Sequence, residues 1–472
     1  MNIDLATLTI ERAHDAFARG DFTPRDLVAA YLERIKEKNA EWNVYREVFE
    51  DVLLLADAAG KRFADGTATM LTGIPIAIKD NILYKNHAAG ASSKILEGYV
   101  ATYTSSALQR LLDAGGIVLG RTNMDEFAMG SSTENSAYGV THNPLDPSRV
   151  PGGSSGGSSA AVAGHLALAA LGTDTGGSIR QPAAFTGTVG MYPTYGTISR
   201  SGIIALASSL DQIGPITRTV RDAEILIECM AGFDPLDATS LPESLRSQSH
   251  APAKKRLGIP RAFLDTDGLA PTVRDNFLKA VEALTGAGYE IVDVTLPLAT
   301  LSLAVYYIIQ PAEASSNLGR YDGLRYGNQK LGADLLETYE RTRGEGFGPE
   351  TRRRIMLGTY VLSHGYYDAY YNKAVKMRDA IKKEFAEVFQ TVDAIITPTT
   401  PSAAFKIGEK SDPLSMYLSD IFTVPANIAQ IPAISVPSGV DENGLPLGLH
   451  IMGPELREDI VFAIANDFEK LK

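Results

Sequence analysis

Cysteine is nearly absent from this sequence, and long apolar runs are missing. Cys229 is the single cysteine among 472 residues, so neither a disulfide framework nor a cysteine-built zinc site can form within one chain. No stretch approaches the roughly 20 apolar residues that a membrane helix needs. Residues 1–22 also lack a basic segment followed by an apolar core, so no secretory signal is visible. We therefore expect a reducing, cytoplasmic setting. The sequence also predicts no metal site on this chain.

Positive charge is the scarcer sign. The chain has 44 lysines and arginines against 56 aspartates and glutamates, which gives a formal net charge of -12. Nucleic acids are bound mainly by basic surface, so this chain is not expected to be the principal platform for one. The charge balance is compatible with a place in a complex in which another subunit holds the nucleic acid.

The sequence that is present has the pattern of an α/β protein. Residues 4–65 are typical of helices; Thr23 can cap one of them, with Pro24 at its first position and Asp26 at its third. Further along, short apolar runs typical of buried strands are separated by helical stretches. This alternation predicts a mixed central β-sheet covered by helices on both faces. The expected strands are residues 74–78, 116–120, 257–259, 291–294, 394–396, 433–436 and 447–451, and residues 234–256 are expected to be a polar surface loop.

Two clusters of glycine and serine, at residues 151–160 and 172–182, carry the chemical information. A flexible linker is the simplest interpretation of such clusters. However, residues 160–171 between them are mostly small and apolar and suit a buried helix, which places both clusters in the core. Neither cluster ends in the Gly-Lys-Ser/Thr of a phosphate-binding loop. Glycine here is therefore expected to let the backbone approach a substrate closely and to free amides for a site.

At these residues the chain resembles the amidase signature family. Residues 152–158 and 176–180 match the two halves of the family signature, and residues 78–80 match its lysine motif. The resemblance implies a Ser–Ser–Lys triad in which Ser178 is the nucleophile, Ser154 is a serine after a cis peptide bond that relays the proton, and Lys79 is the base. It also implies an oxyanion hole, and the backbone amides expected to form it are those of Thr175, Gly176, Gly177 and Ser178.

The chemistry of these residue types fits that triad. A serine hydroxyl is a weak nucleophile until a base takes its proton, and lysine can do so only when burial or nearby positive potential lowers its pKa. Lys79 ends an apolar strand and is a candidate for such burial. The seven histidines lie in no recognisable nucleophile motif. Taken alone, Lys79 would be interpreted as a strand-end lysine that reaches solvent, and Ser178 as a serine in a turn. Only the combination of these motifs is specific for the triad.

The resemblance narrows to one branch of the family, the A subunits of the tRNA-dependent amidotransferases that convert Glu-tRNA(Gln) to Gln-tRNA(Gln). Residues 130–136, 207–215, 313–318, 354–359 and 365–371 carry it. It implies a single amidase signature domain over residues 1–472, with an N-terminal helical region at 1–65 and a catalytic α/β core at 66–472. It further implies that glutamine is hydrolysed, that ammonia passes to a B subunit which uses ATP and Mg on the charged tRNA, and that a C subunit wraps the pair. No cofactor is expected on this chain.

Glutamine carries an α-carboxylate and an α-ammonium group, so its pocket needs a cation and an anion. The resemblance assigns these roles to Arg354 and Asp420, with Ser131 as a weaker pocket candidate; the alternative for Arg354 and Asp420 is that both are surface ions. Two other functions stay open: a stand-alone amidase acting on small or aryl amides, and a non-catalytic scaffold that keeps the fold to support a partner.

Overall fold

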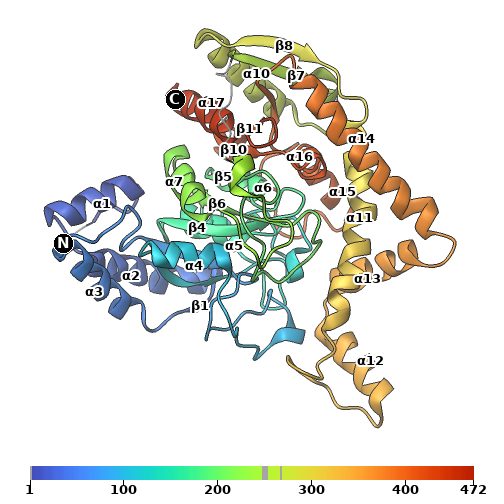
Figure 1. The fold of residues 1–472 in the computed structure, drawn as a ribbon, viewed down its shortest axis with the longest axis horizontal. Coiled ribbons are helices and arrows are strands. Elements are labelled where there is room, and N and C mark those ends of the chain that lie inside the picture. Colours follow the sequence, from blue (N-terminus) through green and yellow to red (C-terminus); the bar gives the residue numbers. More distant parts are fainter. Residues whose placement is uncertain (1–2, 247–253, 266–267, 472) are drawn as a thin grey trace.

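In the described part of the chain, one mixed β-sheet of 11 strands runs through the centre of the molecule (Figure 1). The computed structural model describes residues 3–246, 254–265 and 268–471. Strand β2 is parallel to both of its neighbours, and β7 is parallel to both of its own, whereas the remaining pairs are antiparallel. In sheet order the strands are β1 (Tyr45–Val48), β3 (Ile117–Thr122), β2 (Pro75–Lys79), β4 (Ala169–Asp174), β6 (Gln212–Thr217), β5 (Val189–Tyr192), β10 (Ala433–Val440), β11 (Pro446–Met452), β9 (Ala394–Pro398), β7 (Arg256–Pro260) and β8 (Glu290–Val294).

Helices flank this sheet, which confirms the predicted mixed α/β fold. Helices α5 and α6 pack on each other and on the middle strands, while α7 packs on β6 and against α4 and α17. The α-helices are α1 (Ile10–Arg19), α2 (Pro24–Trp42), α3 (Val52–Ala64), α4 (Ser106–Asp113), α5 (Gly156–Ala163), α6 (Arg180–Thr186), α7 (Val220–Met230), α8 (Glu243–Arg246), α9 (Arg261–Leu264), α10 (Pro271–Gly286), α11 (Ser302–Asn317), α12 (Leu335–Gly346), α13 (Pro349–Leu362), α14 (Asn372–Val388), α15 (Pro413–Tyr417), α16 (Val424–Ala429) and α17 (Glu458–Glu469). Short 3₁₀ turns cover Lys94–Leu96, Glu126–Ala128, Ala299–Leu301, Leu318–Arg320 and Leu418–Asp420, and Tyr367–Tyr371 is a π-helical turn.

The N-terminal region forms helices α1 to α3 and adds one edge strand, β1, to the sheet. The start of α2 is as predicted: the Thr23 hydroxyl accepts from the Asp26 amide, and the Asp26 carboxylate accepts from the Thr23 amide at 2.8 Å. This reciprocal capping box satisfies two amides that the helix leaves unpaired. Because β1 pairs with β3, the region is joined to the sheet by main-chain hydrogen bonds as well as by helix packing.

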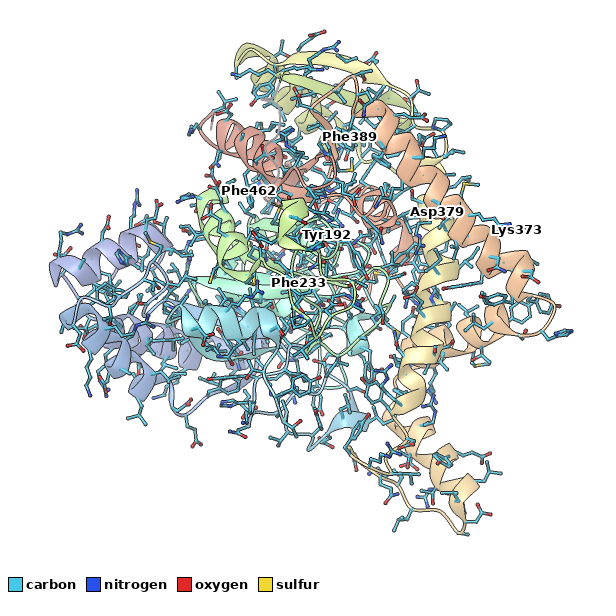
Figure 2. All side chains as sticks on the ribbon, in the orientation of Figure 1. Tyr192, Phe233, Lys373, Asp379, Phe389 and Phe462 are labelled. Carbon is cyan, nitrogen blue, oxygen red and sulfur yellow. The ribbon has the colours of Figure 1, made fainter. Side chains whose placement is uncertain are left out.

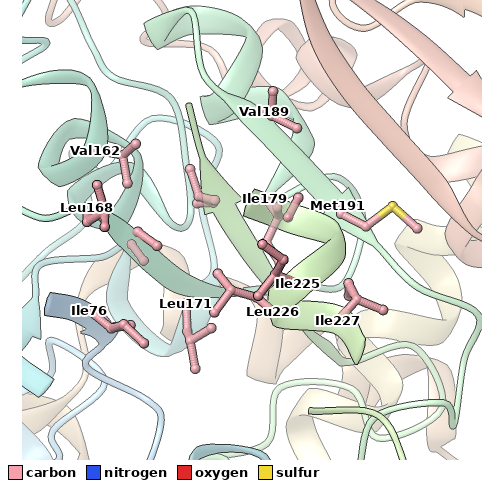
Figure 3. Close-up of a cluster of buried hydrophobic side chains, with 14 of the residues drawn as sticks. Ile76, Val162, Leu168, Leu171, Ile179, Val189, Met191, Ile225, Leu226 and Ile227 are labelled. Carbon is pink, nitrogen blue, oxygen red and sulfur yellow. The ribbon is translucent and has the colours of Figure 1, made fainter. Parts of the chain in front are cut away.

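The core that supports the site lies between β2, β4, β5 and the helices packed on them. Figure 3 shows Ile76 of β2, Val162 of α5 and Leu171 of β4 directed into one cluster with Met191 of β5 and Leu226 of α7. All five side chains are at most 1% exposed. Close packing of this kind holds the ends of β2 and β4 at fixed positions, and those strand ends carry Lys79 and the turn that contains Ser178.

A second layer, formed by α11, α13 and α14, stands beside the sheet, and α12 projects away from it (Figure 1). Figure 2 shows the contrast between Tyr192, which is buried at the centre, and Lys373 and Asp379, which lie on the exposed side of α14. In the described part of the chain, no helix combines the length and the apolarity that crossing a membrane requires.

The structure corrects one local prediction and extends others. Residues 160–171 are not a single helix, because α5 ends at Ala163 and the chain re-enters the sheet as β4 at Ala169. A fully buried strand and a buried helix have the same apolar composition, so periodicity does not separate them. Strands β1, β5 and β6 were not predicted either. In the expected loop 234–256, residues 243–246 form the short helix α8, β7 begins at Arg256, and residues 247–253 lie outside the described residues.

Candidate active site

Lys79 is the last residue of β2, and its side chain is fully buried. The Nζ atom lies 2.7 Å from Ser154 Oγ, 2.8 Å from Ser155 Oγ and 3.0 Å from Thr173 Oγ1. The Ser155 hydroxyl also donates to the Thr173 carbonyl at 3.1 Å, so its proton is already engaged. A neutral amine has two N–H donors and one lone pair. The hydroxyl of Ser154 is therefore available to give its proton to that lone pair.

The electrostatic setting of Lys79 favours the neutral amine. Burial lowers the pKa of Lys79 from 10.5 to about 7, against the opposing effect of the carboxylates of Asp125, Asp174 and Asp211. A lysine with this pKa is present in both protonation states at neutral pH, which is the condition for a general base. The predicted burial of Lys79 is confirmed.

Ser154 follows a cis peptide bond from Gly153 and is fully buried. The Gly153 amide donates to Gln181 Oε1 at 2.9 Å, and the Ser154 carbonyl accepts from the Asp125 amide at 3.3 Å. The backbone on both sides of this bond is therefore tied to two separate segments of the chain. This fixes the Ser154 hydroxyl against Lys79.

Ser178 lies in the turn between β4 and α6 and is half-buried. Its carbonyl accepts from the Ser155 amide at 3.1 Å, which places the turn beside the Ser154 segment. The Asp174 carboxylate holds the turn, because it accepts from the Gly177 amide at 2.7 Å and pairs with Arg180 at 3.0 Å. Among the hydrogen bonds of the described residues, none joins the Ser178 and Ser154 hydroxyls. The structure thus brings Lys79 and Ser154 into contact and anchors Ser178 next to them through the backbone.

The predicted oxyanion donors differ from one another in the structure. The Gly177 amide is engaged by Asp174. The amides of Thr175 and Gly176 carry no such bond among those that link the described loops and turns. The Thr175 hydroxyl donates to Asp211 at 2.8 Å, and the Gly176 carbonyl accepts from Thr423 at 2.8 Å. These contacts hold the turn while the amides of Thr175 and Gly176 remain available to a developing oxyanion.

Arg354 and Asp420 are both buried, with 2% and 7% exposed surface, so neither is a surface ion. Arg354 pairs with Glu350 at 2.7 Å, and its guanidinium lies 4.9 Å and 4.8 Å from the ring centres of Tyr307 and Tyr417. Its Nε and Nη1 atoms are bonded to Glu350 and Gln310; no bond is made by Nη2 in the described part of the chain. One arm of the fork is thus open for a ligand.

Asp420 is connected both to Ser131 and to the turn that contains Gly176 and Ser178. Its carboxylate accepts from the Ser131 hydroxyl, and burial raises its pKa to about 7. The Asp420 carbonyl accepts from the Thr423 amide at 3.1 Å, and the Thr423 hydroxyl reaches Gly176. Asp420 is therefore linked through Thr423 to the turn that precedes Ser178.

Several residues around this site were not found by sequence reasoning. They are Asn81, Asp125, Ser155, Thr173 and Gln181, which contact Lys79, Ser154, each other or the cis peptide. Ser155 and Thr173 lie inside the two glycine-rich clusters, so their position next to the motif residues was a usable signal. Gln181 also lies in the second cluster, whereas Asp125 carries no local signal, because its role depends on contacts made across the fold.

A buried lysine on a serine hydroxyl, beside a second serine in a turn with available amides, is the arrangement of a lysine-assisted serine hydrolase. The chain belongs to the amidase signature family: the profile of the Amidase family matches residues 26–462. It is therefore an enzyme of amidase type.

Its relatives support this assignment over the whole chain. It is 50% identical to the A subunit of glutamyl-tRNA(Gln) amidotransferase from Azorhizobium caulinodans, across 99% of this chain and 97% of the relative. It is 51% identical to the Roseobacter denitrificans protein of the same name, across 95% and 94%. The crystal structure of the corresponding Thermotoga maritima protein superimposes with a TM-score of 0.83 at 42% identity, covering 100% of this chain and 96% of that one. A peptide amidase from Stenotrophomonas maltophilia gives 0.81 at 28% identity, covering 99% and 97%.

Proposed function

We propose that this chain is the glutamine-hydrolysing subunit of a tRNA-dependent amidotransferase. It releases ammonia, which is used to convert Glu-tRNA(Gln) to Gln-tRNA(Gln). The observation that carries the proposal is the contact between the buried Lys79 amine and Ser154, on a chain about half identical, over nearly its full length, to A subunits of glutamyl-tRNA(Gln) amidotransferases. The peptide amidase from Stenotrophomonas maltophilia is more distant, at 28% identity.

In the proposed reaction, neutral Lys79 accepts the proton of Ser154, and Ser154 in turn accepts the proton of Ser178. The Ser178 oxygen attacks the δ-carbonyl carbon of glutamine, and the amides of Thr175 and Gly176 stabilise the oxyanion. The proton returns through Ser154 to the amide nitrogen, the C–N bond breaks, and ammonia leaves a γ-glutamyl ester on Ser178. Water, activated by the same relay, hydrolyses the ester to glutamate.

The open Nη2 of Arg354 would hold the α-carboxylate of glutamine, and ionised Asp420 would hold its α-ammonium group. Both groups are buried, which strengthens charge pairing with a ligand that enters the site. Arg354 is already positioned by Glu350 and the two tyrosine rings, so little side-chain ordering is needed on binding.

The remaining parts of the proposal concern the assembly. The chain would work with a B subunit, which holds the charged tRNA and uses ATP and Mg, and with a C subunit, in the cytoplasm. No step assigned to this chain needs a bound cofactor or metal. Residues 1–472 would form a single domain, of which 1–65 is a helical region and 66–472 the catalytic core. The pairing of β1 with β3 supports a single domain, because it joins the helical region to the sheet of the catalytic core.

The test is co-expression with B and C subunits, followed by a glutaminase assay. We expect the isolated chain to hydrolyse glutamine slowly, and the complex to accelerate when charged tRNA and ATP are added. Ser178→Ala should abolish activity in the complex, whereas Ser105→Ala, which removes a buried hydroxyl of another region, should not. Full turnover of aryl amides by the isolated chain, with no response to partners, would instead identify a stand-alone amidase. Activity of Ser178→Ala near the wild-type level would exclude the mechanism.

A further inference from the structure

Asp125 is a fully buried carboxylate that the proposed reaction does not use. It lies just before the turn Glu126–Ala128, and each of its oxygens accepts one backbone amide. The Thr133 amide donates to Oδ2 at 2.8 Å, and the Asn135 amide donates to Oδ1 at 3.1 Å. Neither partner carries a positive charge, so the negative charge of Asp125 is not neutralised by an ion pair with its hydrogen-bond donors.

Two glycines make room for this carboxylate, and one of them belongs to the cis peptide. A Cβ atom on Gly130 would lie 2.0 Å from Asp125 Cγ, and a Cβ on Gly153 would lie 2.2 Å from Oδ2. The carboxylate is therefore packed directly on the backbone of Gly153. The Asp125 amide also donates to the Ser154 carbonyl at 3.3 Å. Asp125 thus contacts both residues joined by the cis bond.

The same carboxylate acts on Lys79 through its charge. Of the charges that oppose the effect of burial on the Lys79 pKa, that of Asp125 is the largest. Asp174 is neutralised by Arg180 at 3.0 Å and Asp80 by Arg121 at 2.6 Å, so they offer less net charge to the lysine. The charged groups that face this region are Lys79, Asp80, Arg121, Glu134, Asp174, Arg180 and Asp211.

We propose that Asp125 is a positioning residue for the Lys79–Ser154 pair, because its carboxylate and its amide hold the Gly153–Ser154 backbone that places the Ser154 hydroxyl against the Lys79 amine. The backbone contacts of Asp125 and its negative charge act in opposite directions on the reaction. The backbone contacts hold the relay hydroxyl in place, which raises the rate. The charge makes Lys79 a stronger base that stays protonated to higher pH. This inference rests on the proposed function, because it assigns a role within the same triad.

The test compares Asp125→Asn with wild type by the rate at which phenylmethanesulfonyl fluoride labels Ser178, followed by intact mass spectrometry across pH. This readout needs neither glutamine nor partner subunits. We expect the acidic limb of the rate profile to move to lower pH by about one unit, because removing a nearby negative charge lowers a lysine pKa. We also expect the plateau rate to fall at least roughly tenfold, because the asparagine NH2 must face one of two backbone amides.

Asp222→Asn is the matched control. Asp222 is buried like Asp125, and burial raises the pKa of each of these two carboxyl groups to about 6. Asp222 accepts from the Ile10 amide at 2.9 Å in another part of the molecule. This variant should leave both the limb and the plateau unchanged. If the two asparagine variants behave alike, the role assigned to Asp125 is wrong. If wild-type Ser178 is not labelled at any pH, the proposed function itself fails, and the inference fails with it.

Asp125→Glu keeps the test decisive if Asp125→Asn does not fold. Glutamate retains the charge but displaces the carboxylate in a pocket that has no spare volume beside Gly130 and Gly153. We expect its acidic limb to stay at the wild-type position while its plateau rate falls. An unchanged plateau would overturn the positioning role, and a shifted limb would overturn the role of the charge.

Discussion

Replacing Lys79 by methionine should lower the activity and should also remove a pH dependence from the free energy of unfolding. Folding lowers the pKa of Lys79 from 10.5 to about 7 because the side chain is buried. Between these two values the unfolded chain holds a proton on Lys79 that the folded chain does not. The wild type must therefore gain stability as pH rises through this window, by about 1.4 kcal/mol per pH unit. The full lowering of the Lys79 pKa, from 10.5 to about 7, corresponds to about 5 kcal/mol of free energy of unfolding.

Other consequences of the same substitution do not depend on pH in this range. Ser154, Ser155 and Thr173 each lose the amine as a partner, and an unsatisfied buried polar group costs about 1–3 kcal/mol. Removing the buried amine also removes its desolvation penalty. These effects have opposite signs, so the absolute difference in stability is not diagnostic. The change of this stability difference with pH is diagnostic, because it reports the one proton that Lys79 binds in the unfolded chain and not in the folded chain.

Urea unfolding of wild type and Lys79→Met, followed by circular dichroism with refolding verified, measures that slope. Between about pH 7.5 and about pH 9.5, the free energy of unfolding of the wild type should rise by about 2.7 kcal/mol relative to the variant. Lys36→Met, which removes an exposed lysine of α2, should show no such change. The variant should also lose activity by a factor of about 10² to 10⁴, as expected for loss of a general base.

A stability difference between wild type and Lys79→Met that is independent of pH would refute this reasoning. It would mean that Lys79 holds its proton equally in the folded and unfolded chains, so that no neutral amine is available at physiological pH. The triad would then need another base.

Three further predictions address the rest of the site. Burial raises the pKa of Asp420 to about 7, so the carboxylate is protonated as pH falls below that value, and the KM for glutamine should rise there. Asp420→Asn should raise this KM about tenfold or more and remove its pH dependence. A wild-type KM that does not change with pH would contradict the role of Asp420. Gly176→Ala places a methyl 2.8 Å from Tyr306 and should lower kcat, whereas Gly286→Ala, with nothing within 4 Å, should not; equal kcat values would contradict the tight fit. In Arg180→Lys, the lysine cannot replace the guanidinium that binds the Asp174 carboxylate, the Thr423 carbonyl and the Asn427 side chain in the core. The variant should be less stable by about 3–5 kcal/mol, seen as a lower midpoint in thermal unfolding. An unchanged midpoint would contradict this prediction.

The fold was predictable from the sequence where the pattern is local. Seven of the strands were indicated by short apolar runs, and the capping box at Thr23 marked the start of α2. Residues 160–171 were misassigned because a buried strand and a buried helix share one composition. Strand β6 was missed because it contains Gly214 and Pro215, which are unusual within strands.

The site was predictable only in part. The two glycine-rich clusters and the lysine motif indicated which residue types would meet, and the apolar strand before Lys79 indicated its burial. The contact of Arg354 with Glu350 is an i,i+4 pair within α13 and is visible in the sequence. The contacts of Arg354 with Tyr307 and Tyr417 were not predictable, because these residues reach it from α11 and α15.

The sequence by itself determined the chemical repertoire of this protein: two serines in glycine-rich turns, a lysine at the end of an apolar strand, and a single cysteine, Cys229. Only the tertiary structure decided that Lys79 lies 2.7 Å from a serine 75 residues away, and that Asp125 packs on Gly153, the residue before that serine. The physical reason is that burial and strand order set both the distances and the pKa values. Strand order is a property of the whole sheet, which local sequence does not encode.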